Sequence, residues 1–149
     1  MRTARAEATL TLAPEAARRL WTDTRRWASF VEGFGHTLEV SGDWPSEGSK
    51  VVWESGVAGR GRVTEKVVES GADRIATQLF EDALSGTQTV TFAEDAEGSR
   101  VELRLDYELS KYGPLRGLAD VIFIRRALRD SLARTLRRFA TEAAEESAL

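Results

Sequence analysis

Residues 99–146 decide the fold, and they read SRVELRLDYELSKYGPLRGLADVIFIRRALRDSLARTLRRFATEAAEE. The first part of this stretch alternates strictly, with one face made of Val101, Leu103, Leu105, Tyr107 and Leu109. A two-residue period is that of a β-strand with one buried face. From Pro114 to about Glu146 the apolar side chains recur every three or four residues instead, which predicts one long amphipathic helix. At a rise of 1.5 Å per residue this helix would span about 45 Å, enough to cross a whole sheet.

The rest of the chain supplies the other strands. Residues 6–13 alternate like a half-buried strand and stop at Pro14, a residue well suited to begin a helix. Residues 14–34 show helical spacing, and we expect a helix of about three turns followed by a shorter helical piece near residues 27–31. Six alternating runs follow, namely HTLEVSG, GSKVVWESG, GRVTEKVVES, DRIATQLFE, GTQTVTFAED and SRVELRLDYELS. Their connections are short, whereas parallel crossovers need about a dozen residues, so the sequence predicts an antiparallel meander.

The predicted order is strand, two short helices, six strands and a long helix, in a single domain over residues 1–149. A seven-stranded antiparallel sheet with one polar face has to cover its apolar face, and only the last helix is long enough to do so. A strongly curved sheet that grips one helix leaves space between the two. We therefore expect an α+β protein with a cavity between sheet and C-terminal helix, which is where function would reside.

Composition limits the class of function. The chain has 149 residues, no cysteine and a net charge of −3 at pH 7, so we expect no disulfide, no thiolate metal site and no general attraction for nucleic acid. The N-terminus lacks the apolar core of a signal peptide, and no window approaches the roughly 18 apolar residues of a membrane span. We expect a cytoplasmic protein. Because no metal-binding or phosphate-loop motif is present, we expect no metal and no other cofactor.

Four stretches carry a resemblance to a known family: the opening strand that ends in APEAARRLW, then RRWASFVEGF, GRGRVTEKVVES and GTQTVTFAEDAEGSRVELRLDYEL. In this order they resemble the START-like helix-grip (SRPBCC) superfamily, and within it the polyketide cyclase/dehydrase-like group. The resemblance covers residues 5 to 145 and implies a curved sheet wrapped around the long helix. It also implies a hydrophobic small-molecule ligand such as a lipid, a polyketide or another aromatic or isoprenoid compound. Some members catalyse cyclisation or dehydration, but no catalytic signature carries over residue by residue.

Glu65 is the first candidate for chemistry. It shares a strand face with the valines at positions 63 and 67, and a carboxylate in an apolar interior is costly unless something pairs with it or binds there. On a functional interpretation Glu65 lines the cavity as a general acid/base or as the anchor of a ligand hydroxyl. Two structural interpretations stay open. Either a bulge puts Val68 inside in its place, or Glu65 pairs with an arginine such as Arg60 or Arg74.

Tyr107 is the second candidate. Its strand register is unambiguous, and a buried phenol needs a partner, which would be a ligand, Glu65, a water or the backbone. With Glu65 it forms the predicted catalytic pair. The predicted ligand-binding residues are Trp53, Glu65, Phe92, Leu105, Tyr107, Leu118 and Ile122. For each apolar member, ordinary core packing is the alternative.

Other features are open to two interpretations. The register of residues 74–81 is ambiguous, because Ile75 with Leu79 competes against Ala76 with Phe80, so Gln78 points either way. The single histidine, His36, lacks partners for a metal site or a triad, and we expect it at a strand edge. The aromatic side chains at positions 27, 30 and 34 form either a gate at the cavity mouth or plain packing.

The long helix carries an arginine-rich surface: Arg116, Arg125, Arg126, Arg129, Arg134, Arg137 and Arg138. We expect a solvated face balanced by nearby acids, with contact to acidic lipid headgroups or RNA as the alternative. Arg125 falls within the apolar stripe itself and either snorkels or meets an interior carboxylate. Three hypotheses of function follow. The first is binding of a hydrophobic small molecule, the second an aromatase/cyclase- or dehydratase-type enzyme that uses Glu65, and the third a partner-binding protein that uses the arginine-rich helix.

Overall fold

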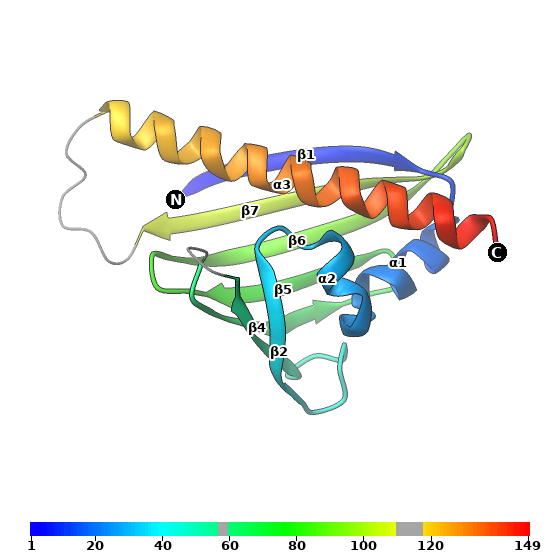
Figure 1. The fold of residues 1–149 in the computed structure, drawn as a ribbon, viewed down its shortest axis with the longest axis horizontal. Helices are drawn as coiled ribbons and strands as arrows, with labels where there is room; N and C mark the ends of the chain where they lie inside the picture. Colours follow the sequence, from blue (N-terminus) through cyan, green and yellow to red (C-terminus); the bar gives the residue numbers. More distant parts are fainter. Residues whose placement is uncertain (57–59, 110–117) are drawn as a thin grey trace.

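A computed structural model of the chain describes residues 1–56, 60–109 and 118–149, without the side chains of residues 118–121 (Figure 1). Its elements are β1 (Arg2–Leu10), α1 (Pro14–Thr22), the 3₁₀ turn η1 (Thr24–Arg26), α2 (Trp27–Phe30), β2 (Phe34–Ser41), β3 (Lys50–Ser55), β4 (Arg62–Ser70), β5 (Arg74–Phe80), β6 (Leu84–Asp95), β7 (Gly98–Leu109) and α3 (Leu118–Ser147). This order confirms the predicted succession of strand, short helices, meander and long helix.

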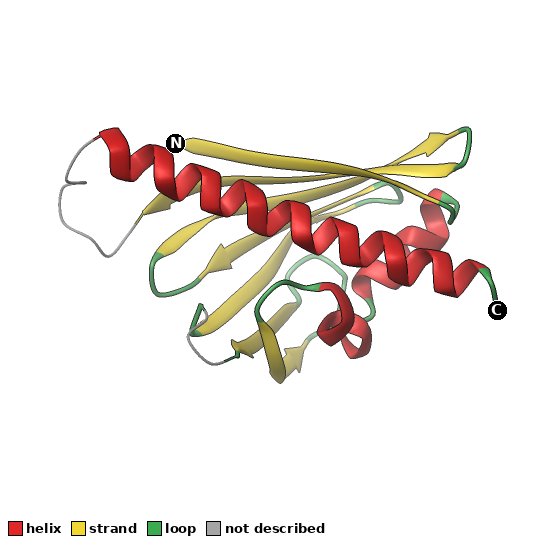
Figure 2. Ribbon diagram, turned by 45° about the horizontal axis from the view of Figure 1, so that its top comes forward, coloured by secondary structure: helices red, strands yellow, loops and turns green. Residues whose placement is uncertain are grey.

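The strands form one antiparallel sheet in the order β1-β7-β6-β5-β4-β3-β2, so β1 and β2 are its edges. Each strand from β2 to β6 pairs with the next one in the chain, as a meander requires, and β1 closes the series beside β7. Figure 2 shows the sheet curving around α3, with the short helices α1 and α2 beside the C-terminal half of that helix. The predicted α+β helix-grip fold is confirmed.

Local sequence explains where the short helices begin and end. Pro14 occupies the first turn of α1, where its missing N–H costs no hydrogen bond. The Asp23 carboxylate accepts a hydrogen bond from the Arg25 backbone N–H at 3.2 Å, which caps the turn that follows. Buried Leu20 and Trp21 give α1 its apolar face toward the sheet.

Ion pairs tie helix α3 to the short helices and to the segment that follows them. The Arg134 and Arg138 guanidiniums both bond the carboxylate of Glu32, the former at 2.9 Å. The Arg26 guanidinium bonds Glu142 at 2.8 Å and Glu146 at 3.1 Å. Part of the arginine-rich surface of α3 therefore forms ion pairs within the molecule. Partial burial raises the pKa of the Glu32 carboxyl, but the two neighbouring guanidiniums lower it by more, so the pKa lies below its usual value.

The structure resolves the ambiguous strand and corrects one expectation. In β5 the side chains of Ile75, Thr77 and Leu79 are buried while Gln78 is exposed, so Gln78 points away from the interior.

Arg125 is exposed and does not reach an interior carboxylate, because the buried face of α3 passes through Leu128 and Leu132. The predicted helix start at Pro114 lies outside the described residues. Within the described residues, no helix combines the length and apolar character needed to span a membrane.

Candidate functional site

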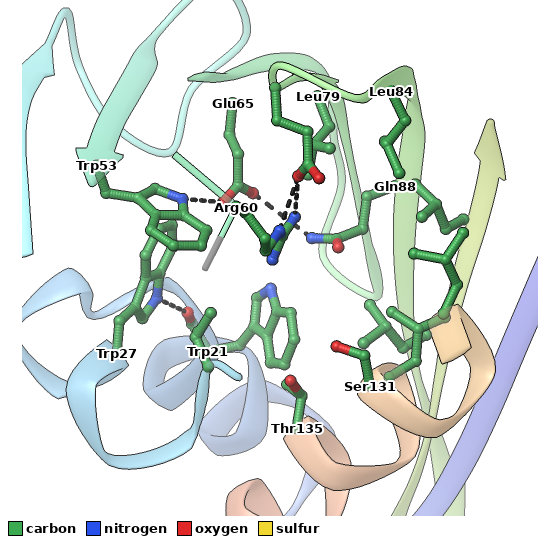
Figure 3. A pocket seen from close by; sticks show the side chains of 16 residues that line it. Trp21, Trp27, Trp53, Arg60, Glu65, Leu79, Leu84, Gln88, Ser131 and Thr135 are labelled. Atoms are coloured by element: carbon green, nitrogen blue, oxygen red, sulfur yellow. Dashed lines mark hydrogen bonds and ion pairs between the residues drawn. The ribbon is translucent and has the colours of Figure 1, made fainter. Parts of the chain in front are cut away.

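A cavity of about 130 Å³ lies between the concave face of the sheet and the middle of α3. Its lining comes from strands β3 to β7, from α1, α2 and α3, and from loops between them, and Figure 3 shows the side chains from close by. The lining residues are Trp21, Trp27, Val31, Trp53, Arg60, Glu65, Leu79, Glu81, Leu84, Gln88, Leu103, Leu105, Leu128, Ser131, Leu132 and Thr135. Apolar side chains dominate, and the polar groups gather at two places, one on the sheet and one on α3.

Glu65 is the centre of the polar group on the sheet. Its side chain points inward from β4 between Val63 and Val67, and the residue is only 6% exposed. The Trp53 indole N–H of β3 donates a hydrogen bond of 2.8 Å to Glu65 Oε2. Thr77 Oγ1 and Gln88 Nε2 each lie 3.5 Å from the other oxygen, Oε1, at the outer limit for hydrogen bonds. Glu65 Oε1 thus keeps hydrogen-bonding capacity on the side that faces the cavity.

Strand β4 contains a bulge, which one of the two structural interpretations of Glu65 required, but the bulge lies after Glu65. The register of β4 against β5 shifts between Val67 and Glu69, after Glu65, and the intervening Val68 is 43% exposed. Glu65 therefore keeps its inward position. Of the two arginines considered as partners, Arg74 bonds Glu69 at 3.3 Å, while Arg60 approaches Glu65 without a direct ion pair.

Burial raises the pKa of the Glu65 carboxyl above its usual value, since desolvation disfavours the ionised form. The Trp53 hydrogen bond and the charge of Arg60 act in the opposite direction, and burial outweighs both. The neutral acid is thereby favoured, and it carries a proton that it can donate. Because Oε2 already accepts from Trp53, Oε1 is the oxygen from which a donated proton would reach the cavity.

Arg60 and Glu81 form the second polar feature of the sheet side. The Arg60 guanidinium bonds Glu81 Oε2 through Nη2 at 2.6 Å and through Nε at 2.7 Å, and the Glu81 side chain is only 6% exposed. The same guanidinium lies 5.0 Å from the centre of the Trp53 ring, a cation–π distance. In Figure 3 the Arg60 side chain lies close to Glu65 and points toward the cavity. The ion pair holds a positive charge beside the Glu65 carboxyl, and this charge lowers the pKa of that carboxyl by less than burial raises it.

The opposite wall is contributed by α3 and the short helices. Leu128, Ser131, Leu132 and Thr135 face the cavity at the three- and four-residue spacing of one helix face. The Thr135 hydroxyl accepts a hydrogen bond of 3.0 Å from the Glu32 backbone N–H, which ties this wall to the segment after α2. A molecule in the cavity would meet an acid and an arginine at one end and hydroxyl groups at the other.

The structure places the predicted ligand-binding residues in three groups. Trp53, Glu65 and Leu105 line the cavity. Phe92 is buried but lies further along β6 than Gln88, and Ile122 is 47% exposed on an early turn of α3, so neither lines it. The side chain of Leu118 lies outside the described residues.

Tyr107 faces the interior with Leu105 and is fully buried, yet it does not line the cavity. It sits one inward position beyond Leu105 on β7, opposite Gly86. Its hydroxyl has no hydrogen-bond partner among the described residues. The expected meeting of Tyr107 with Glu65 is therefore absent from the described contacts.

Replacing Tyr107 by phenylalanine is expected to leave stability unchanged or to raise it by about 1 kcal/mol. A buried hydroxyl without a partner costs free energy, and removing it leaves the ring in place. Urea denaturation of both proteins measures the difference. A loss of more than about 1 kcal/mol would instead mean that the hydroxyl has a partner in the folded protein.

Some cavity residues were within reach of sequence reasoning. Leu103 alternates with Leu105, and Gln88 shares a face with Val90 and Phe92, so the two-residue period alone points them inward. Arg60 and Glu81 carry no such signal, because they flank strands and become neighbours only through the pairing of β4 with β5.

The aromatic side chains considered as a gate are packed against one another. Trp27 lies edge-on to Phe34 at 6.2 Å and to Trp44 at 5.8 Å, and its indole N–H donates to the Trp21 carbonyl at 2.8 Å. Phe30 is fully buried against Trp21. Of the three aromatic residues considered, Trp27 also lines the cavity.

The single histidine lies where the sequence predicted it, on an edge strand. His36 is part of β2, is largely exposed and has Glu54 at 3.9 Å. Within the described residues, no group of acids and histidine is arranged to hold a metal ion.

The seven-stranded sheet gripping one long helix around an internal cavity defines the helix-grip class of proteins. Residues 1–144 match the family described as polyketide cyclase / dehydrase and lipid transport, and the chain belongs to this family. No match was found among curated proteins.

Solved structures of similar fold come from several sources. A protein from Thermus thermophilus is 21% identical with a TM-score of 0.79, and the alignment covers 98% of this chain and 99% of that one. A START superfamily protein from Mycobacterium smegmatis is 11% identical with a TM-score of 0.78, covering 96% and 97%. The di-domain ARO/CYC StfQ of the steffimycin biosynthetic pathway is 14% identical with a TM-score of 0.75, covering 99% of this chain and 52% of StfQ. At these identities the likeness concerns the fold.

Proposed function

We propose that this protein binds a small, largely apolar molecule that carries a carbonyl or hydroxyl oxygen, in the cavity between the sheet and α3. The observation that carries the proposal is the buried Glu65 carboxyl, whose Oε1 has only long hydrogen bonds and lies beside a cavity lined mainly by apolar side chains. A buried carboxyl group with unused hydrogen-bonding capacity destabilises the folded protein, and a ligand oxygen that accepts a hydrogen bond from it would offset that cost. The family, whose description includes cyclase, dehydrase and lipid transport, supports a small-molecule ligand.

The size of the cavity limits the ligand. A cavity of about 150 Å³ accommodates benzene, and this one measures about 130 Å³. We therefore expect a ligand group of about one six-membered ring to fit without rearrangement. Burial of apolar ligand surface would contribute about 25 cal/mol per Å² before ordering costs, so the affinity for a single ring should be modest.

Tryptophan fluorescence provides a direct test, because Trp21, Trp27 and Trp53 line the cavity. Titration with 4-hydroxyacetophenone, which combines one ring with a carbonyl and a hydroxyl, is expected to change the emission in a saturable way. Cyclohexane-sized probes without an oxygen should bind more weakly. Native mass spectrometry of the purified protein should in addition detect any apolar molecule that co-purifies. If neither method detects a saturable ligand, binding at this cavity is rejected.

General acid catalysis at Glu65 is the second candidate function. The specific observation in its favour is the raised pKa of Glu65 beside the Arg60–Glu81 ion pair, since a neutral acid can protonate a carbonyl or a departing hydroxyl. Tyr107 is left out of this candidate because its hydroxyl does not line the cavity. Dehydration of a β-hydroxy ketone, followed by absorbance of the conjugated product, tests it. Glu65→Gln should abolish turnover while leaving ligand binding; turnover equal to that of the unchanged protein would exclude the role.

A further inference from the structure

A second concave surface lies at the edge of the sheet, away from the cavity. It is a groove of about 510 Å³ between edge strand β1, the neighbouring β7 and the N-terminal half of α3. Its lining residues are Thr3, Ala4, Arg5, Arg104, Arg125 and Arg129, none of which lines the cavity. Figures 1 and 2 both show α3 passing over β1 here, near the N-terminus of the chain.

The groove concentrates positive charge from three elements. Four of its six lining residues are arginines and none is acidic, although the whole chain has a net charge of −3. Arg5 and Arg104 stand directly opposite each other in the pairing of β1 with β7, an arrangement that is destabilising for like charges.

Arg104 is the only one of the four with an ion pair among the described residues. Its guanidinium bonds Asp106 at 3.0 and 3.1 Å, and Asp106 also accepts a hydrogen bond from the Thr3 hydroxyl at 2.6 Å. This pairing fixes Arg104 and uses up the nearest acid. Arg5, Arg125 and Arg129 have no acidic partner within 4.0 Å among the described residues.

The C-terminal half of α3 provides the contrast. There Arg134 and Arg138 both form ion pairs with Glu32, so an acid within the molecule balances the charge of these arginines. Arg125 and Arg129 lie one turn apart on the other half and turn toward β1 instead. Guanidinium groups bind phosphate oxygens through paired N–H donors, which suits an oxyanion with several acceptors.

We propose that this groove is an anion site that binds the phosphate group of a small phosphorylated molecule. Arg125 and Arg129 bind the phosphate oxygens from the helix side and Arg5 from the strand side, while Arg104, held by Asp106, is the fourth arginine of the lining. The groove has room for more than the phosphate alone. The groove and the cavity share no lining residue, so variants of one leave the lining of the other unchanged.

Isothermal titration of the full chain with pyrophosphate, at about 50 mM salt so that exposed charges are weakly screened, tests this site. We expect saturable binding with one site per chain. The double variant Arg125→Ala/Arg129→Ala should bind at least about tenfold more weakly, as expected when hydrogen bonds to a charged group are lost. Arg137→Ala is the matched control, because Arg137 is an exposed arginine on the same helix outside the groove, and it should bind as the unchanged protein does.

Three outcomes would overturn the proposal. Equal weakening in Arg137→Ala would mean attraction to the helix charge in general. Binding to vesicles containing phosphatidic acid, or to single-stranded RNA, that depends on Arg125 and Arg129 in the absence of pyrophosphate binding would assign the groove to a membrane surface or to nucleic acid. An absence of saturable heat with a folded protein, verified by circular dichroism, would mean that the groove has no phosphate affinity. None of these outcomes bears on the ligand of the cavity.

Discussion

Glu65→Gln is expected to make the protein more stable than the unchanged chain at pH 8, and equally stable at pH 4. Glutamine has the shape of the protonated acid and keeps an oxygen that can accept the Trp53 indole N–H. It differs in having no ionised form. The variant therefore removes the penalty for keeping Glu65 neutral in the folded protein while it ionises in the unfolded chain.

The direction follows from the raised pKa of Glu65 in the folded state. Below the unfolded pKa, both states hold the proton and the residue contributes no pH dependence. Above it the unfolded state releases its proton first, so the unfolded state binds fewer protons and stability falls as pH rises, until the folded pKa is passed. Between the unfolded and the folded pKa of Glu65, the difference in free energy of unfolding between Glu65→Gln and the unchanged protein grows by up to about 1.4 kcal/mol per pH unit.

Subtracting the unfolding free energies of the two proteins at each pH isolates the contribution of Glu65 from that of the other acids. Asp23 and Asp106 have pKa values lowered by their arginine partners Arg25 and Arg104, so they make stability fall as pH decreases, but they do so equally in both proteins. Urea denaturation at half-unit steps from pH 4 to pH 8 gives the curves. Glu94→Gln, at an exposed position of β6, is the matched control for the chemical change itself. A constant or reversed difference for Glu65→Gln would mean that Glu65 is ionised in the folded protein.

Periodicity predicts most of this fold because burial on one face determines it. The alternation in residues 99–109 and the helical spacing after it define the inner faces of β7 and α3, and short connections permit only a meander. The register of β5 was not predictable, since Ala76 and Ile75 are both buried and the strand offers two apolar series. Pairing with β4 and β6 selects one of them.

The existence of a cavity between the sheet and the long helix was predictable from the sequence, but its extent along the strands was not. The inward direction of Glu65 follows from the strand period, and the structure adds the hydrogen bond from Trp53, whose side chain projects inward from the neighbouring strand. Tyr107 has the same inward direction, yet it is not among the residues that line the cavity. Periodicity defines the face that a side chain occupies, whereas the position of the cavity along the strands depends on where α3 and the short helices leave space.

Leu128→Trp is expected to weaken binding of 4-hydroxyacetophenone by about a hundredfold or more. Leu128 lines the cavity from α3 and is partly buried against the core, so a larger ring at this position would occupy the space of the ligand. Excluding about 100 Å² of apolar ligand surface from burial costs about 2.5 kcal/mol, close to a hundredfold in affinity. Isothermal titration measures the loss without interference from the added tryptophan. Leu38→Trp, at a position of β2 that is 42% exposed, is the matched control and should bind normally.

The opposite change at the same position distinguishes a blocked cavity from a damaged fold. Leu128→Ala enlarges the cavity, so it should improve binding of the two-ring 1-naphthol relative to 4-hydroxyacetophenone, although it destabilises the protein by about 2 kcal/mol or more. Overpacking by the tryptophan costs about 1–3 kcal/mol, and a melting temperature within several degrees of the unchanged protein would establish that the fold persists. If Leu128→Trp stays folded and still binds 4-hydroxyacetophenone with unchanged affinity, the ligand lies elsewhere. If the tryptophan blocks binding and the alanine shifts preference toward the larger ring, the space beside Leu128 determines which ligands this protein accepts.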